Sequence, residues 1–127
     1  MKKATNKLTV GVGTAEEFFE RSLGRARKLD RGETIATEMR LTFEDPADFL
    51  RALTTQRVRV LYAVRKKPAA VSELALRLKR DRTAVKRDVK ILTSLGLVRT
   101  HEETNPGHGR RKIVEPLASR YELVATI

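Results

Sequence analysis

Residues 72–98 of this sequence read SELALRLKRDRTAVKRDVKILTSLGLV, and residues 107–116 read GHGRRKIVEP. The first stretch holds two apolar series at helical spacing, Leu74, Ala75 and Leu78, then Val85, Val89, Leu92 and Leu95. Residues that recur every three or four positions bury one side of a helix. The pattern therefore predicts two short helices joined by Leu78-Lys79-Arg80.

Capping residues mark where these helices begin and end. Ser72 is predicted to cap the first helix, with Val71 packing on Leu76 as a hydrophobic staple. Asp81 is predicted to cap the second helix, and Gly96 to end it. The second helix should thus run over about residues 81–95.

A hairpin is predicted after the second helix. Residues 97–101 read as a strand, residues 104–109 as a turn rich in glycine and proline, and residues 110–117 as a returning strand. Two helices joined by a short turn and followed by a hairpin form a winged helix-turn-helix. We therefore expect an α+β fold in which this motif occupies residues 46–127.

The second helix carries a basic outer side. Its N-terminal half is the part that normally enters a major groove, where Arg and Lys donate to guanine and Thr contacts a base or phosphate. We predict base contacts by Arg82, Thr83, Lys86 and Arg87. Phosphate contacts are predicted for Lys90 and, on the first helix and turn, for Arg77, Lys79 and Arg80. Wing contacts to a minor groove or to backbone are predicted for Arg110, Arg111 and Lys112.

The competing interpretation is an ordinary solvated helix face, with Asp88 as a local charge partner of the basic residues. The distribution of charge favours the first interpretation. Of the net charge of +11, ten units lie in residues 46–100, which hold fourteen Lys or Arg and four acids. A concentrated basic charge suits a polyanion, because neutralising phosphates releases counterions.

The preceding segment, residues 1–45, is expected to be a strand-helix-strand extension. Leu8, Val10 and Val12 alternate as in a strand, and Thr14 and Glu17 form a capping box. The following helix has an apolar stripe of Phe18, Phe19, Leu23 and Ala26, for which core under the strands is favoured over a partner surface. A second strand is predicted at 34–43 from the alternation of Ile35, Met39, Leu41 and Phe43.

Two helices are predicted between the extension and the motif. One begins near Pro46 and carries Phe49, Leu50 and Leu53 at helical spacing. The other is capped by Thr54 or Thr55, with an inward side of Val58, Leu61, Tyr62 and Val64. Residues 121–124 alternate again, which leaves a strand and a frayed terminus both open.

A family resemblance is carried by Ser72–Ala75, by Val85 with Arg87–Val89, and by Leu95–Val98. Residues 46–117 resemble the winged-helix predicted transcriptional regulators of bacteria and archaea related to the MarR and ArsR groups. The resemblance implies a regulator that is usually a homodimer, with residues 81–95 as its recognition helix and 97–117 as its wing. The chain lacks the cysteines of metal-sensing ArsR proteins, and its N-terminus is not the usual MarR dimerisation helix, so neither metal sensing nor drug binding is carried over.

Catalytic, cofactor and metal sites are not expected. Gly11-Val12-Gly13-Thr14 has Glu16 where a dinucleotide fingerprint needs glycine, and the acid would repel phosphate. His101 and His108 are expected to be solvated at the tip of the wing rather than metal ligands. The chain lacks cysteine, a long apolar run and a hydrophobic signal segment, so we expect a cytoplasmic protein that is not an enzyme.

The sequence favours one function and leaves open an alternative from a different class. The first is a sequence-specific transcriptional regulator that binds duplex DNA as a homodimer. The alternative is an antitoxin-like interaction module whose N-terminal segment binds a partner toxin. RNA binding by the same basic surface is less favoured, because no exposed aromatic platform for stacking bases is apparent.

Overall fold

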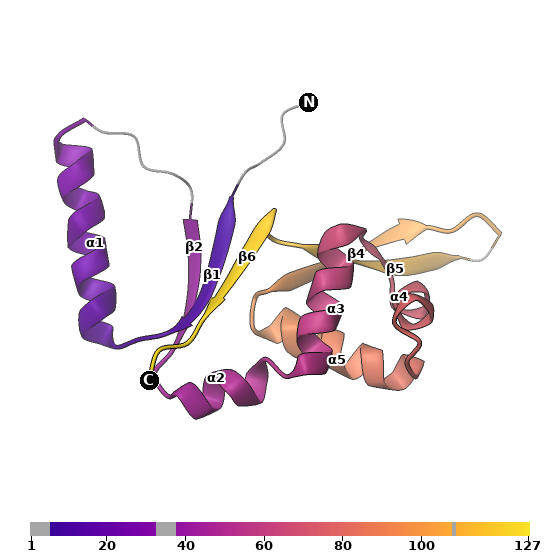
Figure 1. Cartoon of the computed structure of the whole chain (residues 1–127). Helices are drawn as coiled ribbons and strands as arrows, with labels where there is room; N and C mark the ends of the chain where they lie inside the picture. The colour runs from indigo at the N-terminus through magenta and orange to yellow at the C-terminus, as the bar shows by residue number, and fades with distance from the viewer. Residues whose placement is uncertain (1–5, 33–37, 108) are drawn as a thin grey trace. The chain divides into compact units, whose positions relative to one another are not determined.

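The computed structural model of this protein describes residues 6–32, 38–107 and 109–127. These residues belong to two compact units. The first comprises Met1–Arg51 and Arg120–Ile127, and the second comprises Ala52–Ser119. Each unit is built around its own three-stranded sheet (Figure 1).

The sheet of the first unit is parallel, in the order β2-β1-β6. The central strand is β1 (Lys7–Val12), between β2 (Glu38–Phe43) and β6 (Arg120–Val124). The predicted strand with Leu8 and Val10 on one side is confirmed, and both side chains are buried. Residues 121–124, which alternate in sequence, form a strand because β1 offers β6 a free edge with a matching register, Leu8 beside Tyr121 and Val10 beside Leu123.

Helix α1 (Ala15–Asp30) follows β1 in the chain and precedes β2 (Figure 1). It begins with the predicted capping box. The Thr14 hydroxyl accepts a hydrogen bond from the Glu17 amide at 3.1 Å, and the Glu17 carboxylate accepts one from the Thr14 amide at 2.8 Å. The prediction that the apolar stripe is core is wrong for Phe19 and Leu23, which are 61% and 39% exposed. Ile35 and the beginning of the predicted second strand lie outside the described residues.

Helix α2 (Pro46–Ala52) begins at the predicted proline. Phe49 is buried and meets the ring of Phe43 edge to face, with 6.0 Å between the ring centroids. Leu50, expected on the same inward side, is exposed. A helix of only seven residues buries a narrow side, and Phe49 occupies it.

The division of the chain into two compact units differs from the boundary between residues 45 and 46 expected from the sequence. The first unit takes in α2 up to Arg51, and it also takes in β6 from the C-terminal end of the chain. The cause for β6 is its parallel pairing with β1 over five residue pairs, which ties the two ends of the chain into one sheet. Local sequence patterns carry no information about such a distant pairing.

The second unit runs through α3 (Thr55–Lys66), β3 (Ala69–Ala70), α4 (Val71–Leu78), α5 (Arg82–Ser94), β4 (Val98–Thr104) and β5 (Arg110–Pro116). Its sheet is antiparallel, in the order β3-β5-β4. The core is aliphatic and includes fully buried Val60, Val64, Leu74, Val85, Leu92 and Val114. Helices α4 and α5 joined by a short turn, followed by the β4-β5 hairpin, make this unit a winged helix-turn-helix.

Two predicted details of α3 and α4 are corrected. Tyr62 is 58% exposed, and the inner side of α3 is occupied by Val60 instead. Ser72 does not cap α4: the N-cap is Ala70, which has no side-chain hydrogen bond, and the proposed staple fails because Leu76 is 78% exposed. The helix begins early because Ala70 is held in β3 by pairing with Ile113, so the chain turns into the helix at Val71.

Candidate nucleic-acid interface

Helix α5 is fixed at both ends and along one side. Asp81 is its N-cap, as predicted, and accepts a hydrogen bond from the Ala84 amide at 3.2 Å. Val85, Val89 and Leu92 are buried. Gly96 follows the helix with a φ of +79°, a left-handed conformation that glycine adopts without strain. The apolar series thus sets which side chains of α5 face outward.

All five side chains predicted to contact DNA from this helix are exposed: Arg82, Thr83, Lys86, Arg87 and Lys90. Within the described part of the chain, none of them has a hydrogen-bond or ion-pair partner through its side chain. Unpaired cations on a rigid helix keep their full charge available to an anionic ligand.

A groove of about 780 Å³ lies between α5, the beginning of α4 and the wing hairpin β4-β5. Its cationic lining residues come from two elements: Arg82, Lys86 and Lys90 from α5, and Arg110, Arg111 and Lys112 from β5. The remaining lining residues are apolar or hydroxylic, and the described lining includes no acid. We call this feature the basic groove. It brings together residues of α5 and residues of the wing, for which separate DNA contacts were predicted from the sequence.

The other predicted contact residues lie outside the basic groove. Thr83 and Arg87 sit further around α5, toward solvent. Arg77 donates to the Lys67 carbonyl at 2.8 Å and to the Glu73 carboxylate at 2.9 Å. The hydrogen bond from Arg77 is the first cause that holds the pKa of Glu73 below its usual value. Lys79 ends α4 in the left-handed conformation, with a φ of +53°.

Asp88 has a different role from the one expected. It is not a local partner of the exposed bases on α5 but a buried carboxylate, 8% exposed, between two arginines. Arg80 donates to its Oδ2 at 2.8 Å, and Arg57 of α3 donates to its Oδ1 at 3.2 Å. Both guanidinium groups are themselves largely covered. We call these three residues the α5 clamp, because they join α5 to α3 and to the turn before it.

The α5 clamp was missed by sequence reasoning. The only local signal is an acid within a strongly basic helix, at a position next to buried Val89. Arg57 lies 31 residues earlier in the chain, and nothing in the spacing connects the two. The clamp also accounts for Arg80, whose guanidinium is engaged inside the protein.

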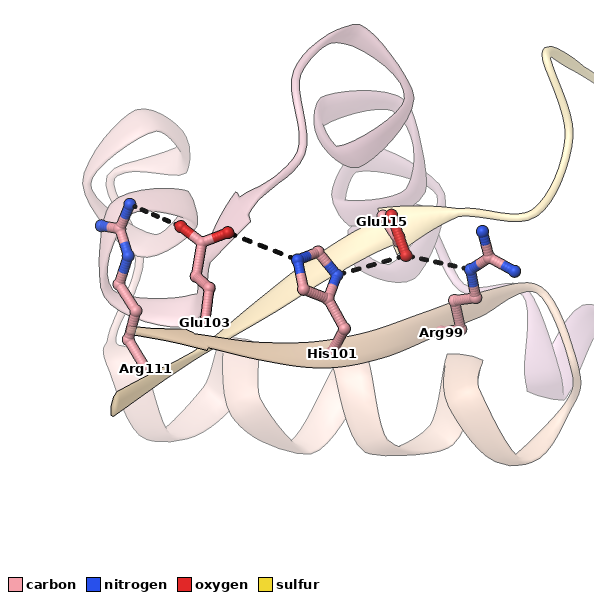
Figure 2. Close-up of polar contacts among 5 residues, drawn as sticks. All are labelled: Arg99, His101, Glu103, Arg111 and Glu115. Atoms are coloured by element: carbon pink, nitrogen blue, oxygen red, sulfur yellow. Dashed lines mark hydrogen bonds and ion pairs between the residues drawn. The ribbon is translucent and has the colours of Figure 1, made fainter. Parts of the chain in front are cut away.

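One face of the wing carries a chain of charged contacts (Figure 2). Arg111 donates to Glu103 at 3.2 Å, and Arg99 donates to Glu115 at 3.0 Å. His101 lies between the two carboxylates, with Nδ1 3.2 Å from Glu115 and Nε2 3.4 Å from Glu103. The hydrogen bond from Arg111 is the first cause that holds the pKa of Glu103 below its usual value, and the contact with His101 is the second.

His101 lies in a strand, β4, as predicted for residues 97–101. It does not lie at the tip of the wing, because β4 extends to Thr104. His108 lies outside the described residues. Among the residues that the structure describes, no group of three or more His, Asp or Glu side chains is placed to hold a metal ion.

Two further features bear on the function classes. At the Gly11-Val12-Gly13-Thr14 turn, the Glu17 carboxylate occupies the space beside Gly13 and accepts a hydrogen bond from the Thr14 amide, where a phosphate would bind. No helix in the described ranges has the length and apolar character needed to cross a membrane.

Comparison with known proteins connects the second unit to a family. The family model HVO_A0114 matches residues 52–116, more than half of the chain. The chain belongs to the HVO_A0114 family. The matched residues coincide with the second compact unit, Ala52–Ser119, so the family match covers the winged helix-turn-helix of this chain.

Solved structures similar to this HVO_A0114 protein include the following three. A possible transcriptional regulator from Methanosarcina mazei Go1 is 22% identical with a TM-score of 0.49, and the match covers 57% of this chain and 65% of that one. HlyU from Vibrio cholerae N16961 is 22% identical with a TM-score of 0.45, covering 58% and 80%. The transcriptional regulator BldR from Sulfolobus solfataricus is 20% identical with a TM-score of 0.45, covering 82% and 69%. This chain therefore spans less than two thirds of the length of the Methanosarcina protein. Among proteins of curated function, none matches this chain in sequence.

Proposed function

We propose that this protein is a sequence-specific transcriptional regulator, not an enzyme, which binds duplex DNA as a homodimer through α5 and the wing. The observation that carries the proposal is the basic groove, which is lined by six cationic residues from two elements and has no acid in its described lining. Two of the six, Arg110 and Arg111, are also ion-paired with Glu102 and Glu103 of the wing. A relationship to the MarR and ArsR groups stays a prediction.

The groove suggests how the contacts are divided. A sugar-phosphate backbone lying in the basic groove would meet Lys90 on one side and the wing residues Arg110, Arg111 and Lys112 on the other. Thr83 and Arg87, on the outer side of α5, would then face base edges in the major groove together with Arg82 and Lys86 at the N-terminal half of the helix. Arg77 and Lys79 remain proposed phosphate contacts, and Arg80 would act there only on leaving Asp88.

The first experiment is fluorescence-polarisation binding to the duplex immediately upstream of the protein's own gene, against a scrambled duplex, across a salt series. Preference for the upstream duplex that survives moderate salt supports a sequence-specific regulator. Equal, salt-labile binding to both contradicts base readout and reduces α5 to an electrostatic anchor.

Two variants on the same helix separate base readout from phosphate binding. Arg87→Ala should cost on the order of 1–3 kcal/mol on the upstream duplex and less on the scrambled one. Lys90→Ala should weaken binding to both duplexes equally. Arg59→Ala, an exposed charge on α3 outside the groove, serves as the control. Equal losses for Arg87→Ala on the two duplexes would refute its assignment to bases.

A further inference from the structure

Helix α1 carries its apolar stripe on its exposed side. Phe19 and Leu23, one helical turn apart, are 61% and 39% exposed, and Ala26 continues the stripe on the next turn. On the opposite side of the helix, Arg21 and Gly24 are half-buried, while Glu17 and Lys28 are exposed. The first unit thus leaves Phe19, Leu23 and Ala26 uncovered. An apolar stripe in this position is typical of a contact surface.

The charges beside the stripe show which occupant fits it. At 100° per residue, Glu16, Glu20 and Arg27 lie along one flank of the stripe. The two acids are in the N-terminal half of α1 and the arginine is in the C-terminal half. All three are exposed, and within the described residues neither Glu20 nor Arg27 has a side-chain hydrogen-bond or ion-pair partner.

Antiparallel pairing of two α1 helices brings the opposite charges of this flank together. In an antiparallel pair related by a two-fold axis, each flank meets the same flank of the other helix in reverse order. With the axis beside Leu23, Glu20 of one copy lies opposite Arg27 of the partner subunit, and the reverse pair forms at the other end. The two helix dipoles also oppose each other, which is favourable. A parallel pair would not bring this flank against itself.

We infer that α1 is the homodimer interface, pairing antiparallel with α1 of a second copy through Phe19, Leu23 and Ala26 and through two Glu20–Arg27 ion pairs. The inference builds on the homodimer of the proposed function but not on DNA binding. The family match begins at residue 52, so this interface belongs to the part of the chain outside the shared winged helix-turn-helix.

Charge reversal on the full chain, measured by analytical ultracentrifugation without DNA, tests the pairing. Glu20→Arg and Arg27→Glu each place like charges opposite one another and should raise the dimer dissociation constant about tenfold. An equimolar mixture of the two variants restores both ion pairs and should return to the wild-type association. The exposed substitution Lys28→Glu, off this flank, is the control and should leave association unchanged.

The inference is overturned if the wild-type chain is monomeric at tens of micromolar, which would leave the stripe to a different protein partner. It is equally overturned if the mixture associates no better than either variant alone. Failure of the protein to bind DNA would not affect this test, because the association is measured on the free protein.

Single cysteines distinguish antiparallel from parallel pairing. The chain has no cysteine of its own, so an introduced thiol can form only an intermolecular disulfide. Leu23→Cys lies at the proposed axis and should crosslink under mild oxidation. Phe19→Cys should not, because in the antiparallel pair the two copies of this position lie on the order of 12 Å apart along the axis. Efficient crosslinking of both variants would indicate parallel helices, and none for Leu23→Cys would remove the proposed axis. Circular dichroism confirms that each variant is folded.

Discussion

At the scale of single residues, Asp88 determines how α5 is held. Its carboxylate accepts hydrogen bonds from guanidinium groups of two elements, α3 and the turn before α5. A buried charge is tolerated only when it is paired, and removing one partner leaves the others uncompensated. The α5 clamp therefore couples the stability of the second unit to the orientation of the helix that carries the basic surface.

Asp88→Ala should lower the free energy of unfolding by about 3 kcal/mol, because Arg57 and Arg80 would remain partly buried after losing the carboxylate between them. Urea unfolding followed by circular dichroism measures the loss. The control is Asp48→Ala, which breaks an exposed ion pair with Arg51 and should cost less than about 1 kcal/mol. Similar losses for the two variants would show that the clamp is no more important than a surface ion pair.

At the scale of elements, the wing combines both charges on one hairpin. Arg110 is ion-paired with Glu102, and Arg111 with Glu103. These pairs are exposed and individually weak. They hold the two arginines along the hairpin, yet a phosphate can replace the carboxylates at little cost. The cations of the wing thus stay available to the basic groove.

Arg111→Ala should raise the pKa of Glu103 toward its usual value, because the hydrogen bond from Arg111 is the main cause of the lowered pKa. The lowered pKa means that ionised Glu103 contributes to wing stability above its unfolded pKa, and that this contribution is lost as the pH falls through the folded pKa. A carbon-13 NMR titration of the side-chain carboxyl measures the shift. Lys112→Ala on the same strand is the control, and an unchanged Glu103 pKa in Arg111→Ala would contradict the assigned cause.

The elements also show what the sequence can and cannot predict. The Asp81 cap, the Val85–Val89–Leu92 series and the Gly96 stop are local, so α5 and its outward residues could be predicted from spacing alone. The α5 clamp and the pairing of β6 with β1 join residues far apart in the chain, and no local pattern encodes them. The predictions that Ser72 caps α4 and that Phe19 is core were wrong for a related reason. The pairing of β3 with β5 sets the start of α4, and α1 leaves Phe19 exposed.

At the scale of the whole molecule, the charge is arranged by unit as well as by residue. Residues 46–100 carry ten of the eleven net positive charges, and the first 45 residues are nearly neutral. The proposed dimer helix α1 lies in that nearly neutral part, with acids toward the N-terminal end of one flank and an arginine toward its C-terminal end. Pairing of two α1 helices therefore brings together segments of low net charge.

The salt dependence of DNA binding should reflect this arrangement. If the four groove cations proposed as backbone contacts, Lys90, Arg110, Arg111 and Lys112, each neutralise one phosphate, a plot of log K against log salt concentration should have a slope of about −4 per bound copy. Lys112→Ala should make the slope less steep by about 1, because one counterion fewer is released. Arg59→Ala, outside the groove, should leave the slope unchanged. Fluorescence polarisation on the scrambled duplex supplies the measurement, because phosphate contacts do not depend on base sequence. A slope that Lys112→Ala does not alter would place the DNA backbone elsewhere than in the basic groove.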